Sequence, residues 1–224
     1  TSAALVVAFA FCLHAASVSA QVINPSFEDD VLPNSGNQFF DADPTGWTTT
    51  GFAGGQRYNG TFTPAATDGD HHAHVSGGAT MSQLLSDVIT DGEIYTLTVD
   101  VGQVSAFSGS TAEIQLYGST AGLGTPLSNA NGTAELTGIA PASGTYITDL
   151  TLTYTALASG DPFAGQSLGI GLIGESGTQV IFDNVRLDIA SAPAPVPEPA
   201  SVAIWSLMGL GLVGFGMYRA RRKK

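Results

Sequence analysis

The sequence predicts an all-β protein: a jelly-roll β-sandwich ectodomain, preceded by an N-terminal signal segment and followed by one C-terminal transmembrane helix. Three observations lead to this prediction. Apolar and polar residues alternate with a period of two through most of residues 21–189, which is the pattern of half-buried strands. Gly, Asn, Asp, Ser and Pro fill the gaps between these segments, as turns require. No part of the region has the apolar stripe of an amphipathic helix.

Residues 1–20 are interpreted as a signal peptide. Residues 2–14 form an apolar run too short to span a bilayer, and Val18-Ser19-Ala20 before Gln21 carries the small residues that signal peptidase accepts. The basic segment that normally comes first is absent, so we expect the given sequence to begin inside a longer reading frame. The alternative is a buried N-terminal helix. Cys12, the single cysteine, lies in this segment, which excludes a disulfide framework and a cysteine-built zinc site.

Residues 21–189 are predicted to form one β-sandwich domain. A change of phase at Asp183-Asn184 predicts a β-bulge in the last strand. The segments Asp30–Gly46 and Tyr117–Gly144 are expected to be the longest loops and the places where functional contacts occur. The predicted strands, long ones first, are Tyr95–Val101, Ala112–Leu116, Ile147–Thr155, Leu168–Leu172, Val180–Ile189, Gly46–Thr50, Ala73–Ser76 and Thr80–Leu85.

The C-terminal end has three parts. Residues 190–199 form a Pro/Ala linker, and residues 200–218 contain no charged residue. At about 1.5 Å per residue, 19 helical residues reach about 28 Å, which is close to the thickness of the hydrocarbon core of a bilayer. Residues 219–224 form a basic tail, which predicts that the C-terminus stays in the cytoplasm while the ectodomain lies outside. The cations of this tail are Arg219, Arg221, Arg222, Lys223 and Lys224.

This arrangement resembles the PEP-CTERM sorting signal of exported bacterial proteins. The matching parts are Pro197, Glu198 and Pro199, the Gly-rich apolar helix and the basic terminus, in this order. The resemblance implies processing near the motif by an exosortase-type membrane enzyme. It also implies a Gram-negative bacterium, transit through the inner membrane, and a final location on the cell surface or in the extracellular matrix.

The ectodomain resembles the galactose-binding-like jelly roll that several carbohydrate-binding module families use. The order of short sequence pieces along the whole ectodomain carries this resemblance. The pieces are Val22–Glu28, Gly46-Trp47, Asp68-Gly69-Asp70, Met81–Leu85, Tyr95–Gly102 and Ile181–Asp188. Because one fold serves many functions, ligand binding is an analogy at this point.

Charge limits the partners of the ectodomain. The chain has a net charge of −12, and residues 21–196 hold 18 acidic residues against Arg57 and Arg186 alone, a net charge of −16. This field repels anions and excludes a nucleic-acid partner, which needs clustered Lys and Arg. It favours divalent cations and neutral ligands such as polysaccharides, although solubility alone also accounts for it.

A structural calcium ion is the first candidate cofactor. The resemblance to galactose-binding-like domains implies a calcium site where the N-terminal segment meets the last strand, with Glu28 and Asp183 as the carboxylates. Calcium takes six to eight oxygen ligands, and two carboxylates would offset its charge. The alternative is that both residues cap strand ends or meet Arg186. No dense calcium-binding loop is present.

Three histidines, at positions 71, 72 and 74, form a second candidate metal site. In a strand, however, His72 and His74 share one face while His71 points to the other. At most two of them converge on one ligand, so we expect a solvent-facing strand edge rather than a zinc or copper site.

Aromatic side chains are candidates for contact with a sugar ring. Trp47 is expected in the core. The tentative ligand-binding residues are Tyr58 and Tyr117, with Arg57 as a possible donor to a hydroxyl group.

The sequence gives little support for catalysis. It contains no nucleophile elbow, HExxH motif or phosphate-binding Gly loop, and with 18 carboxylates any acid pair can be proposed. We therefore expect an exported, non-enzymatic binding or structural module, with no catalytic residue. The alternatives are a carbohydrate-binding module with structural calcium and, third, a hydrolase acting on polysaccharides.

Overall fold

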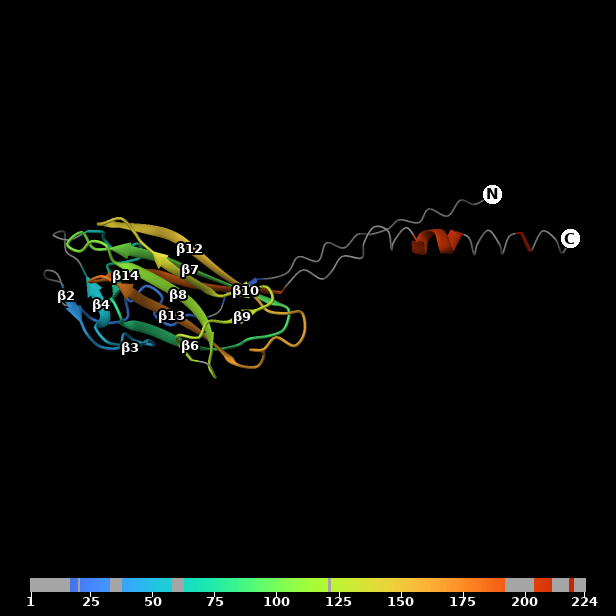
Figure 1. Ribbon diagram of the computed structural model, residues 1–224, viewed down its shortest axis with the longest axis horizontal. Coiled ribbons are helices and arrows are strands. Elements are labelled where there is room, and N and C mark those ends of the chain that lie inside the picture. Colours follow the sequence, from blue (N-terminus) through green and yellow to red (C-terminus); the bar gives the residue numbers. More distant parts are fainter. Residues whose placement is uncertain are drawn as a thin grey trace. The chain divides into compact units, whose positions relative to one another are not determined.

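The structure is a computed structural model that describes residues 17–19, 21–32, 38–57, 63–120, 122–191, 204–210 and 218–219. It divides into two compact units, Thr1–Ala192 and Pro193–Lys224. The first unit is built from strands that pair in antiparallel fashion throughout (Figure 1). This confirms the all-β sandwich prediction.

Two sheets make up the sandwich. Sheet A has the order β12-β7-β14-β5-β4-β2, with β1 also paired to β14, and sheet B has the order β11-β8-β13-β6-β3. Neighbouring strands are mostly distant in sequence, so the chain crosses between the sheets repeatedly. In sheet A the strands are β1 (Ser17–Ser19), β2 (Gln38–Phe40), β4 (Ala53–Arg57), β5 (His71–Val75), β7 (Glu93–Gln103), β12 (Thr145–Thr155) and β14 (Val180–Ser191). In sheet B they are β3 (Thr48–Thr50), β6 (Thr80–Val88), β8 (Thr111–Gly118), β11 (Glu135–Ile139) and β13 (Ser167–Ser176). A short hairpin of β9 (Ser128–Asn129) and β10 (Gly132–Thr133) stands apart.

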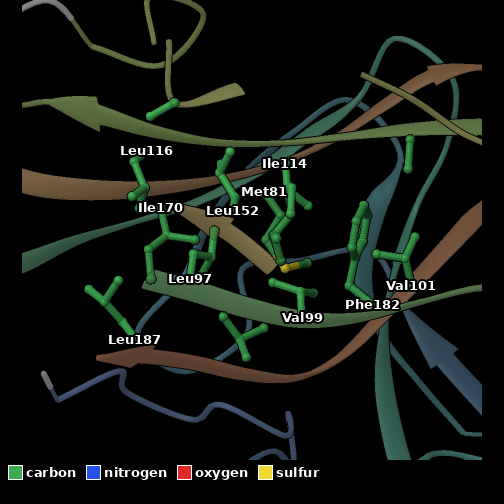
Figure 2. Packing of buried hydrophobic residues seen from close by; sticks show 14 of the residues in the cluster. Met81, Leu97, Val99, Val101, Ile114, Leu116, Leu152, Ile170, Phe182 and Leu187 are labelled. Carbon is green, nitrogen blue, oxygen red and sulfur yellow. The ribbon is translucent and has the colours of Figure 1, made fainter. Parts of the chain in front are cut away.

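The core lies between the two sheets. Alternate side chains of each strand point inward, so that Leu97 and Val99 of β7 and Phe182 of β14 meet Met81 of β6 and Ile170 of β13 (Figure 2). All five are 0% exposed. Burying one such side chain contributes roughly 1.5–3 kcal/mol. The apolar alternation of the sequence is therefore what joins the sheets, and Trp47, at 3% exposed, belongs to this core as predicted.

The predicted strands agree with those observed. Each of the long segments is a strand, and the register of β14 on β7 shifts between Asp183 and Arg186, which confirms the bulge. Asn184 at the shift has a φ of 51°, a conformation that Asn tolerates better than most residues. The two segments predicted as loops contain short strands, β2 in the first and β9, β10 and β11 in the second. These strands are too short to show a period of two, and they form because they pair at sheet edges or with each other.

In the second unit, residues 204–210 are helical. No helix among the described residues is both long and apolar enough to cross a bilayer. Most of the predicted span 200–218 lies outside the described residues, as do Pro197, Glu198 and Pro199 and, apart from Arg219, the basic tail. At the other end, residues 1–16 and Ala20 of the predicted signal peptide also lie outside them, while Ser17–Ser19 form β1.

Candidate ligand-binding face

One face of sheet A points away from the core and carries buried polar side chains. Inward positions on β5, β14 and β7 are apolar, so His72, Asp183 and Asp100, at the alternate positions, point to the other side. We call this side the outer face. The three side chains are at most 2% exposed. Polar groups are seldom buried without a purpose, because their desolvation costs free energy.

The described part of the connection between β4 and β5, residues 63–70, lies against the outer face. At one end, the amide of Ser105 donates to the carbonyl of Thr63 (2.7 Å), next to the end of β7. At the other end, Thr67 and Asp68 donate to Asp183 of β14. Residues 63–70, which we call the covering segment, therefore reach across the sheet from β7 back to the start of β5.

Two carboxylates fasten the covering segment. Asp183 Oδ2 accepts hydrogen bonds from the Thr67 amide (2.6 Å), the Thr67 hydroxyl (2.9 Å) and the Asp68 amide (3.0 Å). Glu28 Oε1 accepts from the amides of Asp70 (2.6 Å) and His71 (2.5 Å). Hydrogen bonds to a charged acceptor are stronger than neutral ones. The two predicted calcium ligands thus hold the same short stretch of backbone.

The surroundings of these carboxylates bear on the calcium prediction. The groups that point at Glu28 Oε1 and Asp183 Oδ2 are N–H and O–H donors, whereas calcium is bound by acceptor oxygens. A calcium ion between the two residues would require the donors to turn away from these lone pairs. Among the described residues, no group of three or more His, Cys, Asp or Glu side chains is placed to hold a metal ion. The calcium site stays a prediction.

Asp183 and Asp100 are direct partners on neighbouring strands of the outer face. The side-chain amide of Asn184 donates to Asp100 Oδ2 (3.3 Å), and the Asp149 amide donates to Asp100 Oδ1 (2.7 Å). Burial raises the pKa of Asp183 to about 6, although its hydrogen bonds with Asp68, Thr67 and Asn184 lower it. Asp183 therefore retains a proton at a higher pH than an ordinary Asp side chain.

The histidines of β5 are the clearest correction to the sequence prediction. They were expected at a solvent-facing edge, but β5 lies between β14 and β4 and all its residues are buried. The predicted division of faces is right: Ala73 and Val75 join the core, while His72 and His74 lie on the outer face. Phe39 of β2 and Phe52 lie against the ring of His74, and such cover arises from tertiary structure that a period of two does not reveal.

Both outer-face histidines are neutral near pH 7. Burial, followed by repulsion from His74 and His71, lowers the pKa of His72 to about 3. Burial also lowers the pKa of His74, partly offset by its hydrogen bond with Asp41, whose Oδ1 lies 3.1 Å from His74 Nε2. The outer face is therefore polar around β5 without carrying positive charge.

A glycine makes room on the same face. Gly102 of β7 is paired with Tyr146 of β12 on one side and Ile181 of β14 on the other. A Cβ atom at Gly102 would lie 2.7 Å from the Tyr146 ring and 2.9 Å from Ile181 Cγ1. The ring of Tyr146 therefore lies across the sheet at a position where only glycine leaves space.

An aromatic pair forms the open end of the outer face. Phe39 of β2 and Phe52, just before β4, are 56% and 47% exposed, and their ring centroids are 6.1 Å apart. The ring of His74 lies 5.2 Å from Phe52 and 6.0 Å from Phe39. The His74 partner Asp41 keeps 40% of its side chain exposed. Two half-exposed rings with a carboxylate beside them suit an uncharged ring that carries a hydrogen-bond donor.

An open surface depression of about 440 Å³ is lined in part by Phe39. This volume lies in the range typical of small-molecule sites. Its lining residues are Asp30, Val31, Leu32, Gln38, Phe39 and Phe40.

The two tentative ligand-binding residues that the structure describes, Arg57 and Tyr117, lie on different sheets. Arg57 Nη2, at the end of β4, lies 3.1 Å from Oδ2 of Asp70, the last residue of the covering segment. Tyr117 lies on sheet B and is 6% exposed, since its ring packs where a Cβ atom of Gly169 would be. Its ring is thus not an open platform. Tyr58 lies outside the described residues.

Sequence reasoning missed Phe39, Asp41 and Asp100. Asp100 occupies an outward position in the alternating segment Tyr95–Val101, where a polar residue is ordinary. Phe39 and Asp41 lie in a segment predicted as a loop. The pair Phe39-Phe40 inside an otherwise polar stretch could have indicated a short strand here. In an extended chain two adjacent side chains point to opposite faces, so one ring can enter the protein while the other lies on the surface.

Family models match most of the chain. A model described as HpiC1-like, HpiC1 cyclase, matches residues 18–188. The PEP-CTERM protein-sorting motif matches residues 195–223. The motif confirms the resemblance found in the C-terminal sequence, and it indicates an exported protein that is sorted to the cell envelope. No curated protein matches the chain significantly.

Several solved structures are similar to this chain. An apo-form cyclase from Fischerella sp. is 25% identical, with a TM-score of 0.65 over 80% of this chain and 98% of that one. A cyclase from Fischerella sp. TAU in complex with 4-(1H-indol-3-yl)butan-2-one is 25% identical, with a TM-score of 0.63 over 79% and 100%. The CBM22-1 xylan-binding domain of Paenibacillus barcinonensis Xyn10C is 16% identical, with a TM-score of 0.43 over 79% and 95%.

Proposed function

The chain belongs to the HpiC1-like cyclase family, and from this premise we propose that it is an exported binding protein of the cell surface or matrix. Its ligand is an uncharged, ring-containing molecule, which it binds without converting it. The binding surface is the open end of the outer face of sheet A. The proposal includes a Gram-negative host and processing by an exosortase-type enzyme, and the sorting motif supports both.

The observation that carries this proposal is the aromatic pair at the buried histidine. Phe39 and Phe52 expose about half of their surface beside His74, and large exposed rings held in place are unusual unless they serve contact. Neutral histidines and an acidic ectodomain disfavour an anionic ligand. A neutral polysaccharide or a small aromatic compound satisfies these conditions, and the related Fischerella cyclase is solved with an indole compound.

Ligand titration of two variants tests the proposal. We expect Phe39→Ala and Phe52→Ala to weaken binding of 4-(1H-indol-3-yl)butan-2-one, or of a neutral oligosaccharide, by about tenfold each, because ring contacts contribute about 0.5–1.5 kcal/mol beyond the buried area. Leu84→Ala is the matched control, since Leu84 is 54% exposed but lies on sheet B. Isothermal titration calorimetry gives the affinities. Equal affinity in all variants, or no binding of either probe to the native protein, contradicts the proposal.

A second candidate function is that of a cyclase. The family model and Asp183 favour it: a buried carboxyl group with a pKa of about 6 keeps its proton up to about pH 6 and can donate that proton to a bound unsaturated substrate. The donor would act from the middle of the outer face, beside the neutral His72.

Product analysis separates the two functions. Incubation with an alkenyl indole substrate, followed by mass spectrometry and NMR, reveals a cyclised isomer of equal mass if the protein is a cyclase. Asp183→Asn should then abolish turnover while ligand binding persists, and Asp188→Asn on the same strand should leave turnover unchanged. Binding without any isomer supports the non-enzymatic function.

A further inference from the structure

Strand β12 lies at an edge of sheet A (Figure 1). Among the strands that the structure describes, β12 pairs with β7 alone, and the ladder keeps one register over Leu150–Thr155. Side chains alternate along this stretch: Leu152 and Tyr154 are buried, whereas Thr151 and Thr153 are exposed. An edge strand presents backbone N–H and C=O groups to its surroundings, so the direction of these groups decides what the edge can bind.

One set of backbone groups in β12 is used by β7. The amide of Ala156 donates to the carbonyl of Glu93 (2.9 Å), which continues the ladder beyond the last residue of β12. In an antiparallel ladder, residues that bond to the neighbouring strand alternate with residues that do not. Tyr154 and Leu152, at every second position from Ala156, therefore also bond to β7.

The backbone groups of the three threonines between these positions point away from β7. The carbonyl of Thr155 shows this direction directly, because it accepts hydrogen bonds from the side-chain amides of Asn129 (3.1 Å) and Asn131 (3.0 Å) in the β9–β10 hairpin. The same alternation turns the N–H and C=O groups of Thr153 and Thr151 outward, to the side opposite β7.

Two features limit the open edge to a short stretch. At one end, the hairpin holds the carbonyl of Thr155. At the other end, the register shifts between Ile147 and Leu150, and Asp149 has a φ of 54°. A bulge of this kind bends the strand and interrupts regular pairing. The stretch that can accept a further strand is therefore Thr151–Thr153.

This edge is complementary to itself. Residues 150–154 read Leu-Thr-Leu-Thr-Tyr, so a copy rotated about a two-fold axis at Leu152 places threonine opposite threonine and apolar residues opposite apolar residues. Residues 150–160 contain no charged residue, although residues 21–196 hold 18 acidic residues against two basic ones. Two copies of such an acidic domain repel each other least where the surface is uncharged.

We propose that a second copy of this chain binds at β12, so that the two β12 strands pair in antiparallel fashion about an axis at Leu152. Thr151 and Thr153 then exchange backbone hydrogen bonds with Thr153 and Thr151 of the second copy, and their side chains form cross-strand pairs. Sheet A continues from one sandwich into the other. Because the contact uses the same edge in both copies, assembly closes at the dimer.

Disulfide trapping tests the register of this pairing. The full chain is prepared in detergent micelles with Cys12→Ser, and Thr151→Cys or Thr153→Cys is added to separate samples. Opposed residues of a bonded pair lie about 5.5 Å apart, within reach of a disulfide, whereas the same residue in the two copies lies on a diagonal of about 7–8 Å. We expect a mixture of the two variants to form several-fold more disulfide-linked dimer than either variant alone. Ser86→Cys mixed with Val88→Cys, two exposed positions of β6 in sheet B, is the matched control.

Sedimentation velocity over a concentration series measures the dimer itself. We expect its dissociation constant to fall as salt is added, because salt screens the repulsion between the acidic domains. Thr153→Asp should raise the dissociation constant at least about tenfold, since the two-fold axis brings the added charges of both copies together. Ser86→Asp on β6 is the control for an added charge at an exposed strand position, and thermal unfolding shows whether both variants are folded.

Two results would overturn the inference. The first is a chain that sediments as a monomer at every concentration and whose mixed cysteine variants link no more than the control pair, which leaves the edge to an extended chain of a different protein. The second is a dimer that survives Thr153→Asp unchanged, because it must then form through another surface. Neither result concerns ligand binding on the outer face, so failure of the dimer is distinguishable from failure of the proposed function.

Discussion

Glu113 of β8 illustrates how neighbouring carboxylates set the charge of a single residue. Burial raises the pKa of Glu113 to about 7, and repulsion from Glu135 and Glu175 contributes in the same direction. At any pH between the ordinary pKa of a Glu side chain and about 7, this carboxyl group therefore takes up a proton when the protein folds. Its contribution to stability is fully present below about pH 4.5 and is lost as the pH rises through 7.

The variant Glu113→Gln should remove this pH dependence. We expect it to be more stable than the native protein at pH 8, because the repulsion of the ionised Glu113 is gone, and to show a flatter change in stability between pH 5 and pH 8. Urea unfolding at several pH values measures both effects. Asp87→Asn, which removes a carboxylate of β6 outside this cluster, is the control. An unchanged slope in the Glu113 variant would contradict the assignment.

Gly102 provides a test of packing on the outer face. Adding one methyl group in Gly102→Ala brings a Cβ atom to 2.7 Å from the Tyr146 ring, so the ring must move. We expect a loss of about 1–3 kcal/mol and a melting temperature lower by roughly 2–4 °C for each kcal/mol. Thermal unfolding measures this loss. In the double variant with Tyr146→Ala the loss should be smaller than the sum of the single losses; simple additivity contradicts the contact.

The covering segment is the element through which a cation would act on the whole domain. Asp183 binds Thr67 and Asp68, and Glu28 binds Asp70, so a metal ion that bound both carboxylates would draw the same backbone closer. Without such an ion the amide donors of the segment already neutralise much of the charge. Calcium would add to the stability of the domain only if it bound these carboxylates more strongly than the hydrogen-bond donors of the covering segment do.

Melting curves with calcium or with a chelator test the predicted site. Calcium at about 100 times its dissociation constant should add about 2.7 kcal/mol if it binds only the folded protein, and differential scanning calorimetry detects such a shift. The shift should disappear in Asp183→Asn and persist in Asp188→Asn. An identical midpoint in both solutions removes the calcium assignment.

The strands show which parts of a fold can be predicted from sequence. The long strands, such as β7 and β13, were predictable because one complete face of each is buried in the core. The burial of His72 and His74 was not, since it depends on strands packed on both sides of β5, which the alternation along β5 itself does not reveal. The pairing of Asp100 with Asp183 was hidden for a similar reason: it depends on a register set by strands about 80 residues apart. The candidate site was therefore only partly predictable, through Asp183.

At the scale of the molecule, the C-terminal sorting motif should decide where the protein resides. Deleting Val196–Lys224 removes most of the motif matched at residues 195–223. We expect the ectodomain to be released into the medium, because neither the basic tail nor the apolar stretch remains to retain it. Immunoblots of medium and cell fractions measure the release. Replacing only Arg57, a cation of the ectodomain, is the control, and unchanged retention of the deleted form contradicts the expectation.

The antiparallel register of β1 on β14, with Ser19 opposite Asp188, brings the beginning and the end of the sandwich together. Gln21 follows β1 closely and Ser191 ends β14, so about 15–20 Å of extended chain separates them. A linker of roughly eight residues spans this gap. The domain is therefore suited to circular permutation: a chain joined from Ser191 to Gln21 and opened at the exposed turn between β9 and β10 keeps every strand of both sheets except β1.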